Sequence, residues 1–341
     1  MSASGEPGTA PATLDVVGLG NALVDVLSHE SESFLAEHGL VKGAMDLVDT
    51  ERAELLYGAM GPGIEISGGS AANTMVGIAS LGGTSAFIGR VRDDTLGKVF
   101  AHDIRAAGVQ FPGVPANDGL PTGRCLIVVT PDAERTLNTY LGAAAEFGPE
   151  DVDADLVTGA QVTYLEGYLW DQPRAKEAFR HAAQLAHRAG RRVALTLSDG
   201  FCVDRHRADF LDLIEREVDI LFANEGEILS LYEVDDFDAA LQRVNHHCEI
   251  AALTRSAKGS LIVRGDEVHL IDAHPVPSGV VDTTGAGDQY AAGFLYGFTH
   301  GHDLGTCGRL GAVAAGEVIS HLGARPEVSL ADLARPLLSQ R

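Results

Sequence analysis

Basic residues are scarce in this chain of 341 residues, which carries 25 Lys and Arg against 48 Asp and Glu and a formal net charge of −23. Most of such a surface repels phosphates, which argues against nonspecific binding to nucleic acid or to an acidic membrane. Long hydrophobic runs are also missing, since no apolar stretch approaches the roughly 20 residues that span a bilayer. We therefore expect no nucleic-acid or membrane partner.

Cysteine is rare as well, and its four positions, Cys125, Cys202, Cys248 and Cys307, form no C-x-x-C pair. No set of Cys and His has the spacing of metal ligands. This pattern is typical of free thiols in a reducing compartment, so we expect a cytoplasmic protein. Residues 1–13 are rich in Ser, Gly, Pro and Ala and lack the features of a signal peptide, which predicts a disordered tail.

Two nucleotide-binding motifs are absent. No G-x-x-x-x-G-K-[ST] occurs, so phosphates are not held by the lysine of a P-loop. The segment Gly18-Leu19-Gly20 has Leu23 where a dinucleotide fingerprint needs its third glycine, which argues against a dehydrogenase.

The most informative segment that is present runs from Asp282 through Gly285-Ala286-Gly287 to Asp288, directly before the apolar run 289–295. Glycines at a helix start leave backbone N–H groups uncovered, and the helix dipole adds partial positive charge there. Such a turn can bind a transferred phosphate, and the carboxylate of Asp288 can accept a proton from an attacking hydroxyl. The alternative is a tight strand-to-helix turn with Asp288 as its cap.

Two polar segments occur early in the chain. Asn21 and Asp25 follow the strand-like run 14–20, and they are expected beyond its carboxyl end, where their amide and carboxylate groups can hold the vicinal hydroxyls of a sugar. Gly68 and Gly69, followed by Asn73, precede an apolar helix and allow a ligand to approach the backbone closely. Turn capping by Asn21 or Asp25, and a helix N-cap at Ser70, are the simpler interpretations.

A third polar segment, Asn224 to Glu227, ends the apolar run 219–224. Both side chains lie on one side of a starting helix, where a carboxylate can hold the water shell of Mg²⁺ near phosphates. Acidic residues are also common in a first helical turn because of the dipole alone.

Apolar runs at 14–20, 86–91, 162–168, 193–198, 219–224 and 250–254 alternate with helical patterns, as at 173–189. This alternation predicts an α/β fold with a mostly parallel, doubly wound sheet covered on both faces. A hairpin at 261–272 fits an antiparallel edge of that sheet.

Other short strands break the alternation. Residues 125–130 and 135–140 are joined by the turn Pro131–Glu134, and runs at 45–49 and 64–67 are also strand-like. These pieces are expected to form a small separate sheet that acts as a lid and keeps water from a reacting phosphate. A dimer contact is the alternative.

Together, the Asn-x-x-x-Asp, Gly-Gly-x-x-x-Asn, Asn-x-x-Glu and Asp-Thr-x-Gly-Ala-Gly-Asp segments resemble the ribokinase-like (PfkB) family of carbohydrate and nucleoside kinases, over about residues 14–335. The segments 129–135, 139–144 and 166–170 look most like its adenosine kinase branch. The resemblance implies a three-layer α/β/α kinase domain over residues 14–341, with lid segments near 45–49, 64–67 and 125–140. It also implies a monomer or homodimer that uses ATP and Mg²⁺, with K⁺ as an optional further ion.

The same resemblance assigns roles to single residues. Asp288 is the base, and Gly285, Ala286 and Gly287 form the anion hole. Asn21, Asp25, Gly68, Gly69 and Asn73 hold the sugar, Arg135 approaches the transferred phosphate, and Leu169 and Phe201 line the base pocket. Asn224, Glu227, Thr254 and Gly259 bind ATP and Mg²⁺, while Asp282 and Thr284 match positions that bind a monovalent cation in some relatives.

The function that follows is an ATP-dependent nucleoside kinase, most like adenosine kinase, that phosphorylates the ribose 5′-hydroxyl. A sugar kinase of the same fold, an inosine or guanosine kinase, and a non-catalytic nucleoside sensor are the alternatives, although a sensor has no need of a base at Asp288.

Overall fold

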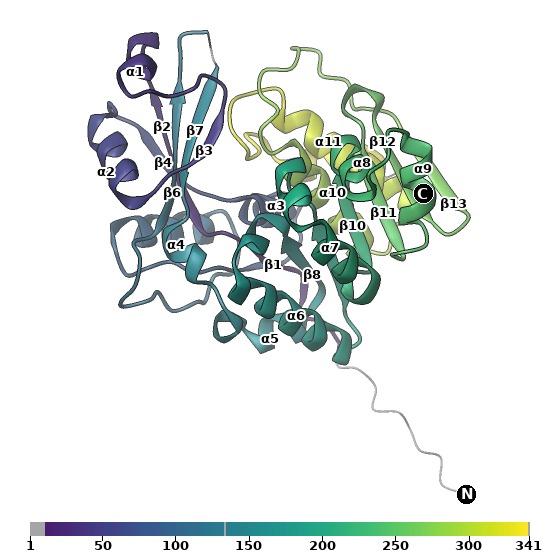
Figure 1. Cartoon of the computed structure of the whole chain (residues 1–341). Helices are drawn as coiled ribbons and strands as arrows, with labels where there is room; N and C mark the ends of the chain where they lie inside the picture. The colour runs from purple at the N-terminus through teal and green to yellow at the C-terminus, as the bar shows by residue number, and fades with distance from the viewer. Residues whose placement is uncertain (1–10, 133, 340–341) are drawn as a thin grey trace, which may run out of the picture.

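The structure is a computed structural model that describes residues 11–132 and 134–339. Within these ranges the chain forms a large sheet wrapped by helices and a smaller sheet that stands beside it (Figure 1). The tail predicted at residues 1–13 lies largely outside the described residues, as does residue 133 of the expected hairpin turn.

The large sheet has eight strands in the order β13-β12-β11-β10-β9-β8-β1-β5. All neighbours pair in parallel except β11 with β12 and β12 with β13, which are antiparallel as expected from the hairpin at 261–272. The strands are β1 (Leu14–Leu19), β5 (Ser85–Ile88), β8 (Ala160–Glu166), β9 (Arg192–Thr196), β10 (Ile220–Asn224), β11 (Ile250–Thr254), β12 (Ser260–Arg264) and β13 (Glu267–Ile271).

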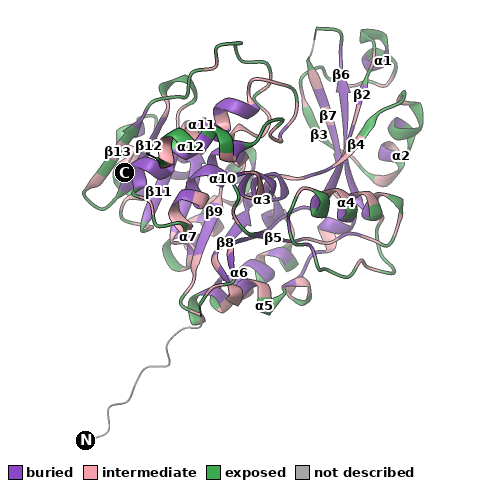
Figure 2. Cartoon of the chain, turned by 180° about the vertical axis from the view of Figure 1, so that it is seen from behind, coloured by how far each residue is buried: buried purple, intermediate pink, exposed green. Residues whose placement is uncertain are grey.

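Helices cover both faces of this sheet, and its strands are buried between them (Figure 2). One face carries α5 (Ala154–Gly159), α6 (Pro173–Arg188), α7 (Gly200–Glu217), α8 (Glu225–Tyr232) and α9 (Phe237–Val244). The other carries α3 (Ser70–Ser80), α4 (Thr95–Ala106), α10 (Ala286–Thr299) and α11 (Leu304–Val318), with α12 (Leu330–Leu338) outside α11. The predicted α/β fold, a mostly parallel doubly wound sheet with helices on both faces in three layers, is confirmed.

The helix expected at 173–189 illustrates why these segments fold as they do. Pro173 occupies the first helical turn, where its missing N–H costs nothing. The alanines and Phe179 at three- and four-residue spacing are all buried against the sheet, while charged residues face outward. Among the described residues, no helix is both long and apolar enough to cross a membrane.

The second sheet has five strands in the order β3-β7-β6-β2-β4. They are β2 (Leu23–His29), β3 (Met45–Leu47), β4 (Ile64–Gly68), β6 (Gly123–Val129) and β7 (Arg135–Tyr140). Helices α1 (Glu32–Glu37) and α2 (Thr50–Ala59) lie on its outer side (Figure 1), and short 3-10 turns occur at Gly142–Glu146, Pro149–Asp151, Gly167–Asp171 and Ser256–Lys258.

The small sheet expected from residues 45–49, 64–67 and 125–140 therefore exists, but the sequence analysis misses one of its strands. It expects Asp25 to project beyond the carboxyl end of the first strand and assigns it to no strand of its own, whereas this residue lies inside β2, paired with Ile66 on one side and Cys125 on the other. The pairing of β2 with β6 joins residues about a hundred positions apart, so no local signal announces it. We call this five-stranded sheet the lid sheet.

The chain reverses its direction of winding between β1 and β8, which are neighbours in the large sheet. Such a switch point opens a crevice at the carboxyl ends of its strands, where ligands of doubly wound folds bind. Asn21 follows β1 and Glu166 ends β8, so both lie at this crevice, beside the start of the lid sheet.

Candidate active site

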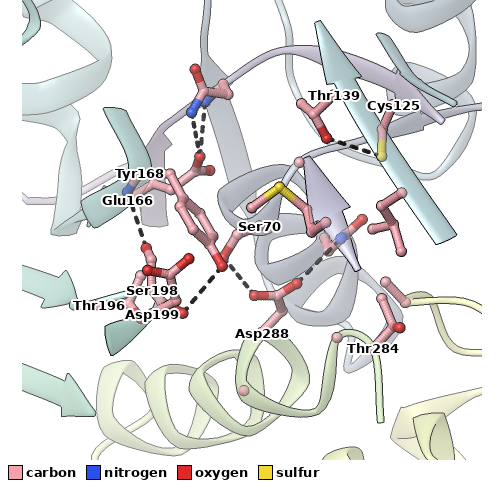
Figure 3. Close-up of a pocket in the computed structure, with 18 of the residues that line it drawn as sticks. Ser70, Cys125, Thr139, Glu166, Tyr168, Thr196, Ser198, Asp199, Thr284 and Asp288 are labelled. Carbon is pink, nitrogen blue, oxygen red and sulfur yellow. Dashed lines mark hydrogen bonds between the residues drawn. The ribbon is translucent and has the colours of Figure 1, made fainter. Parts of the chain in front are cut away.

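A cavity of about 780 Å³ lies at this switch point, between the lid sheet and the carboxyl ends of the central strands. Its lining combines polar groups from the segment after β1, from β8 to β11, and from α3 and α10 with apolar side chains from the lid sheet. The close-up in Figure 3 shows side chains converging from these separate elements. Residues far apart in the sequence thus meet at one site.

Asp288 lies in the first turn of α10 and points into the cavity (Figure 3). Its carboxylate accepts hydrogen bonds from the Ser70 hydroxyl at 2.6 Å and from the Asn73 amide at 3.2 Å. Burial raises the pKa of Asp288 to about 6, although these two hydrogen bonds pull it down. A buried carboxylate with a pKa near 6 is suited to accept a proton at neutral pH.

The turn before Asp288 has the geometry expected of an anion pocket. Gly285 is the residue before the helix, with φ 76°, and a Cβ there would collide with Ala324. A Cβ on Gly287 would meet nothing within 4 Å, so the backbone at this position is uncovered toward the cavity. The N–H of Ala286 donates to the Thr283 carbonyl at 3.2 Å, which leaves the N–H groups of Gly287 and Asp288 for an anion at the start of α10.

Asn21 is held by a buried carboxylate that the sequence analysis did not assign. Its side-chain amide donates to Glu166 at 2.8 Å and its backbone N–H donates to the same oxygen at 3.3 Å. The other oxygen of Glu166 accepts the N–H of Ala71, at 2.8 Å, in the first turn of α3. Because the Asn21 amide nitrogen is directed to Glu166, its oxygen is left to accept from a ligand hydroxyl.

Gly69 brings the start of α3 close to Asn21. Its φ is 97°, and a Cβ would collide with the Asn21 carbonyl, so only glycine fits there. Gly68 packs directly against the carboxylate of Asp25. Ser70, considered as an N-cap, is not the cap, which is Gly69; its hydroxyl donates to Asp288 instead.

The inner face of the lid sheet combines one carboxylate with apolar side chains. Strand alternation places Asp25 on the same face as Cys125 and Thr139, which pair with each other across β6 and β7. The other lid-strand residues that line the cavity are the apolar Leu23, Met45, Leu47, Ile127 and Leu137, together with Asp46 between the two β3 side chains. Burial raises the pKa of Asp25 to about 6, while the guanidinium groups of Arg325 and Arg135 lower it.

At the far end of the cavity, Asn224 and Glu227 form a capping box at the start of α8. The Glu227 carboxylate accepts the backbone N–H of Asn224 at 2.9 Å and its side-chain amide at 2.6 Å. Burial raises the pKa of Glu227 to about 7, and the nearby carboxylate of Asp199 adds to the effect. Both residues thus cap α8, a role that the sequence analysis did not assign to them, and both line the cavity beside Asp199.

Arg135 reaches from β7 of the lid sheet to the loop before the anion pocket, where it forms a buried ion pair with Asp282. Asp282 also accepts the N–H of Gly323 at 2.9 Å and the hydroxyl of Thr284 at 2.7 Å. Burial opposes its ionisation, but these hydrogen bonds and Arg135 hold the pKa of Asp282 below its usual value. Thr284 lines the cavity.

Four further expected residues divide into two pairs. Thr254 and Phe201 line the cavity, and Phe201 is 78% exposed at its mouth. Gly259 packs under the backbone of Ile271, outside the lining. Leu169 is buried in the helix-covered core on the other side of the sheet, and its neighbour Tyr168 lines the cavity instead. The assignment of Leu169 to the base pocket is therefore corrected: a 3-10 turn at 167–171 rotates it inward.

Comparison with known proteins agrees with this geometry. The sequence profile of pfkB family carbohydrate kinases matches residues 64–330. The chain belongs to this family. It is therefore a kinase that transfers phosphate to a hydroxyl group, and the predicted family membership is confirmed.

Individual relatives include both nucleoside and sugar kinases. The adenosine kinase from Sinorhizobium meliloti is 55% identical, with a TM-score of 0.88, and the match covers 95% of this chain and 99% of that one. A probable sugar kinase protein from Rhizobium etli is 53% identical, with a TM-score of 0.88 and coverage of 95% and 98%. The adenosine kinase of Saccharomyces cerevisiae is 28% identical over 333 residues, 91% of this chain and 96% of its own length. The family is settled, and the acceptor is not.

For a pfkB family kinase the donor is ATP, and the family implies Mg²⁺. The residues fit such an ion, because the carboxylates of Asp199 and Glu227 line one cavity, and a cation there would offset the repulsion from Asp199 that contributes to the raised pKa of Glu227. Their remaining lone pairs can hold metal-bound waters. Among the described residues, no cluster of three or more His, Cys, Asp or Glu could hold a metal ion by itself.

Glu166 gives a prediction about this kinase. Both of its oxygens accept N–H groups, and Glu166→Gln replaces one of these oxygens by an amide nitrogen that cannot accept, which leaves a buried donor unpaired. We expect a loss of about 1–3 kcal/mol in the free energy of unfolding and a raised KM for the acceptor. Urea unfolding at pH 8 measures the first effect and steady-state kinetics the second.

The matched control is Glu150→Gln, which breaks an ion pair with Arg174 in which both side chains are about half exposed. Exposed pairs contribute little, so the control should change the free energy of unfolding by less than about 1 kcal/mol. Equal effects of the two substitutions would show that Glu166 does not anchor Asn21.

Proposed function

We propose that this protein is an adenosine kinase, which transfers the γ-phosphate of ATP to the ribose 5′-hydroxyl. The observation that carries the proposal is the apolar inner face of the lid sheet, directly beside the hydroxyl-binding groups. A free sugar presents hydroxyls on every side, and contact with Leu23, Ile127 and Leu137 would leave some of them unpaired. A nucleoside presents hydroxyls at one end and a flat base at the other, which matches both halves of the cavity.

In this proposal Asn21 and Asp25 hold the ribose hydroxyls, with Gly68, Gly69 and Asn73 supporting them, and Phe201 covers the base. Asp288 accepts the proton of the 5′-hydroxyl as its oxygen attacks phosphorus. The N–H groups at Gly285–Gly287 stabilise the charge that develops on the transferred phosphate, and Arg135 joins them from the lid sheet.

ATP lies on the opposite side of the anion pocket, along Asn224, Glu227 and Thr254. Mg²⁺, when bound, neutralises charge on its phosphates. Gly259 supports this region from below. We include a K⁺ ion near Asp282 and Thr284 in the proposal. Because Asp282 pairs with Arg135, its carboxylate would contact both the ion and the guanidinium.

Phosphorylation rates across a panel of adenosine, inosine, guanosine, ribose and fructose test the assignment. We expect the highest kcat/KM for adenosine. A higher value for a free sugar would make the protein a sugar kinase, the alternative supported by the 53% identical relative from Rhizobium etli. A higher value for inosine or guanosine would keep the mechanism and change the base.

The lid sheet gives a further prediction. Its face toward the cavity contacts the bound base, so nucleoside should slow amide exchange in residues 125–140 more than in β8–β11, where protection is already high. Hydrogen exchange followed by mass spectrometry, with and without adenosine, measures this difference. Unchanged protection of residues 125–140 would make the hairpin a static element or a subunit contact, and water would have to be excluded by another part of the protein.

A further inference from the structure

Arg325 lies in the loop between α11 and α12 and carries a partly buried positive charge beside the acceptor site, with 14% of its side chain exposed, in a protein where such charges are few. All three nitrogens of its guanidinium donate hydrogen bonds. One donates to Asp103 of α4 at 2.8 Å, one to the Ser67 hydroxyl of β4 at 2.7 Å, and Nε donates to the Asn73 oxygen of α3 at 3.3 Å. Three elements of the chain therefore meet on one side chain.

The first two contacts fix a strand of the lid sheet to the main body. Asp103 accepts from the Ser67 backbone N–H at 2.8 Å and from its hydroxyl at 2.6 Å, with the same oxygen that accepts from Arg325. Although burial opposes ionisation, the contacts with Ser67 and Arg325 hold the pKa of Asp103 below its usual value. Ser67 precedes Gly68 and Gly69, so this anchor lies where β4 of the lid sheet enters α3.

The third contact orients Asn73, whose side chain contacts Asp288, the proposed general base. An amide side chain can present either its oxygen or its nitrogen in a given direction. Arg325 donates to the Asn73 oxygen, so the Asn73 nitrogen is turned to the carboxylate of Asp288, at 3.2 Å. With the amide reversed, its oxygen would face a carboxylate and repel it.

The charge of Arg325 acts on a second acceptor-site group. Burial raises the pKa of Asp25 to about 6, and Arg325 is the strongest influence that lowers it. The other charged groups that face Asp25 are Arg135 of β7, which also lowers its pKa, and Asp288 of α10, which raises it. The thiol of Cys125 faces it from β6, and burial raises the pKa of that thiol to about 12, so it stays neutral near pH 7.

We propose that Arg325 is a positioning residue of the acceptor site, which anchors β4 of the lid sheet to α4 and sets Asn73 and Asp25 around the hydroxyl that is phosphorylated. It acts through these residues and does not line the cavity itself, whereas its neighbour Ala324 does. The inference rests on the proposed roles of Asp25 and Asp288, and on no choice between nucleoside and sugar.

Two substitutions separate the effect of the Arg325 charge from the effect of its hydrogen bonds. Arg325→Gln removes the charge, and Arg325→Lys keeps it but cannot form three fixed hydrogen bonds. In both variants kcat should fall about 10- to 100-fold, the value of one lost charge-assisted hydrogen bond, while the KM for ATP stays within about threefold.

The pH dependence of acceptor binding distinguishes Arg325→Gln from Arg325→Lys. Acceptor affinity is measured by calorimetry between pH 5 and pH 8 in the Asp288→Asn background, where Asp25 titrates without its acidic neighbour. Affinity should fall as pH drops through the pKa of Asp25. Arg325→Gln should move this fall upward by roughly one pH unit, whereas Arg325→Lys should leave it near its original position.

Arg90→Gln is the matched control, since Arg90 forms an ion pair with Asp151 at 3.0 Å that is similarly buried but lies outside the cavity lining. It should lower stability without changing kcat or the pH profile. A purely structural role of Arg325 would give this same result in its variants, and it would overturn the proposal. If Arg325→Gln does not fold, Arg325→Lys decides alone, because unchanged kcat in that variant contradicts positioning.

These measurements use whichever acceptor gives the highest kcat/KM with the unaltered protein. If that acceptor is a sugar, the adenosine assignment fails, but the Arg325 variants still test the positioning role with that sugar. If adenosine is the acceptor and the Arg325 variants behave like the control, only the inference about Arg325 fails.

Discussion

Replacing Asp288 by Asn should lower kcat by a factor on the order of 10²–10⁴, the usual contribution of a general base. The amide has nearly the same shape and can still accept from Ser70, so the fold and the binding of ATP should persist. Steady-state kinetics at saturating substrates measure the loss, and thermal unfolding checks the fold. A kcat within tenfold of the unaltered protein would leave Asp288 as a helix cap only.

Asp303→Asn is the matched control for this substitution. Asp303 also stands at the start of a helix, where it accepts the N–H of Thr306 at 2.9 Å, and it lies outside the cavity lining. Its replacement should leave kcat unchanged.

The unaltered protein should in addition lose kcat as pH falls below about 6, because burial raises the pKa of Asp288 to about 6 and the protonated carboxyl cannot act as a base.

Replacing Asp25 by Ala should lower kcat/KM for the acceptor by about 100-fold, since a carboxylate that accepts from a hydroxyl contributes about 1.5–3 kcal/mol. Most of the change should appear in KM for the acceptor, with some loss of kcat if the 5′-hydroxyl is displaced, while ATP affinity stays unchanged. Kinetics with adenosine and its 2′- and 3′-deoxy analogues measure this effect.

Glu65→Ala is the control, because Glu65 lies on the outer face of the same sheet, hydrogen bonded to Tyr57 at 2.6 Å. Its replacement should not change kcat/KM. If the unaltered protein phosphorylates the deoxy analogues as well as adenosine, Asp25 does not hold the ribose hydroxyls.

Sequence reasoning was most successful where the residues of a motif are consecutive in the sequence. The segment 282–288 predicts a glycine turn followed by a helix with a carboxylate in its first turn, and the structure has all three features. The alternation of strands and helices likewise predicts the large sheet, because each parallel strand is a buried apolar run. The functional roles of these residues remain predictions until the variants are measured.

Sequence reasoning failed where the site depends on contacts between distant residues. Glu166 meets Asn21 across 145 positions and Arg325 meets Ser67 across 258, and a lone charged residue gives no local sign of such a partner. The strand that contains Asp25 pairs only with distant segments, so its place in the small sheet could not be read from the residues around it. Leu169 and Tyr168 differ by one position in a 3-10 turn, which decides whether a side chain faces the core or the cavity.

The most direct test of the central claim is the product of one reaction. The protein is mixed with ATP, Mg²⁺ and adenosine, and ADP and phosphorylated nucleoside are quantified together by mass spectrometry and phosphorus NMR. The account predicts one 5′-phosphorylated adenosine for each ADP, and almost none with Asp288→Asn. ADP formed without phosphorylated adenosine, or a phosphate at the 2′- or 3′-position, would contradict it.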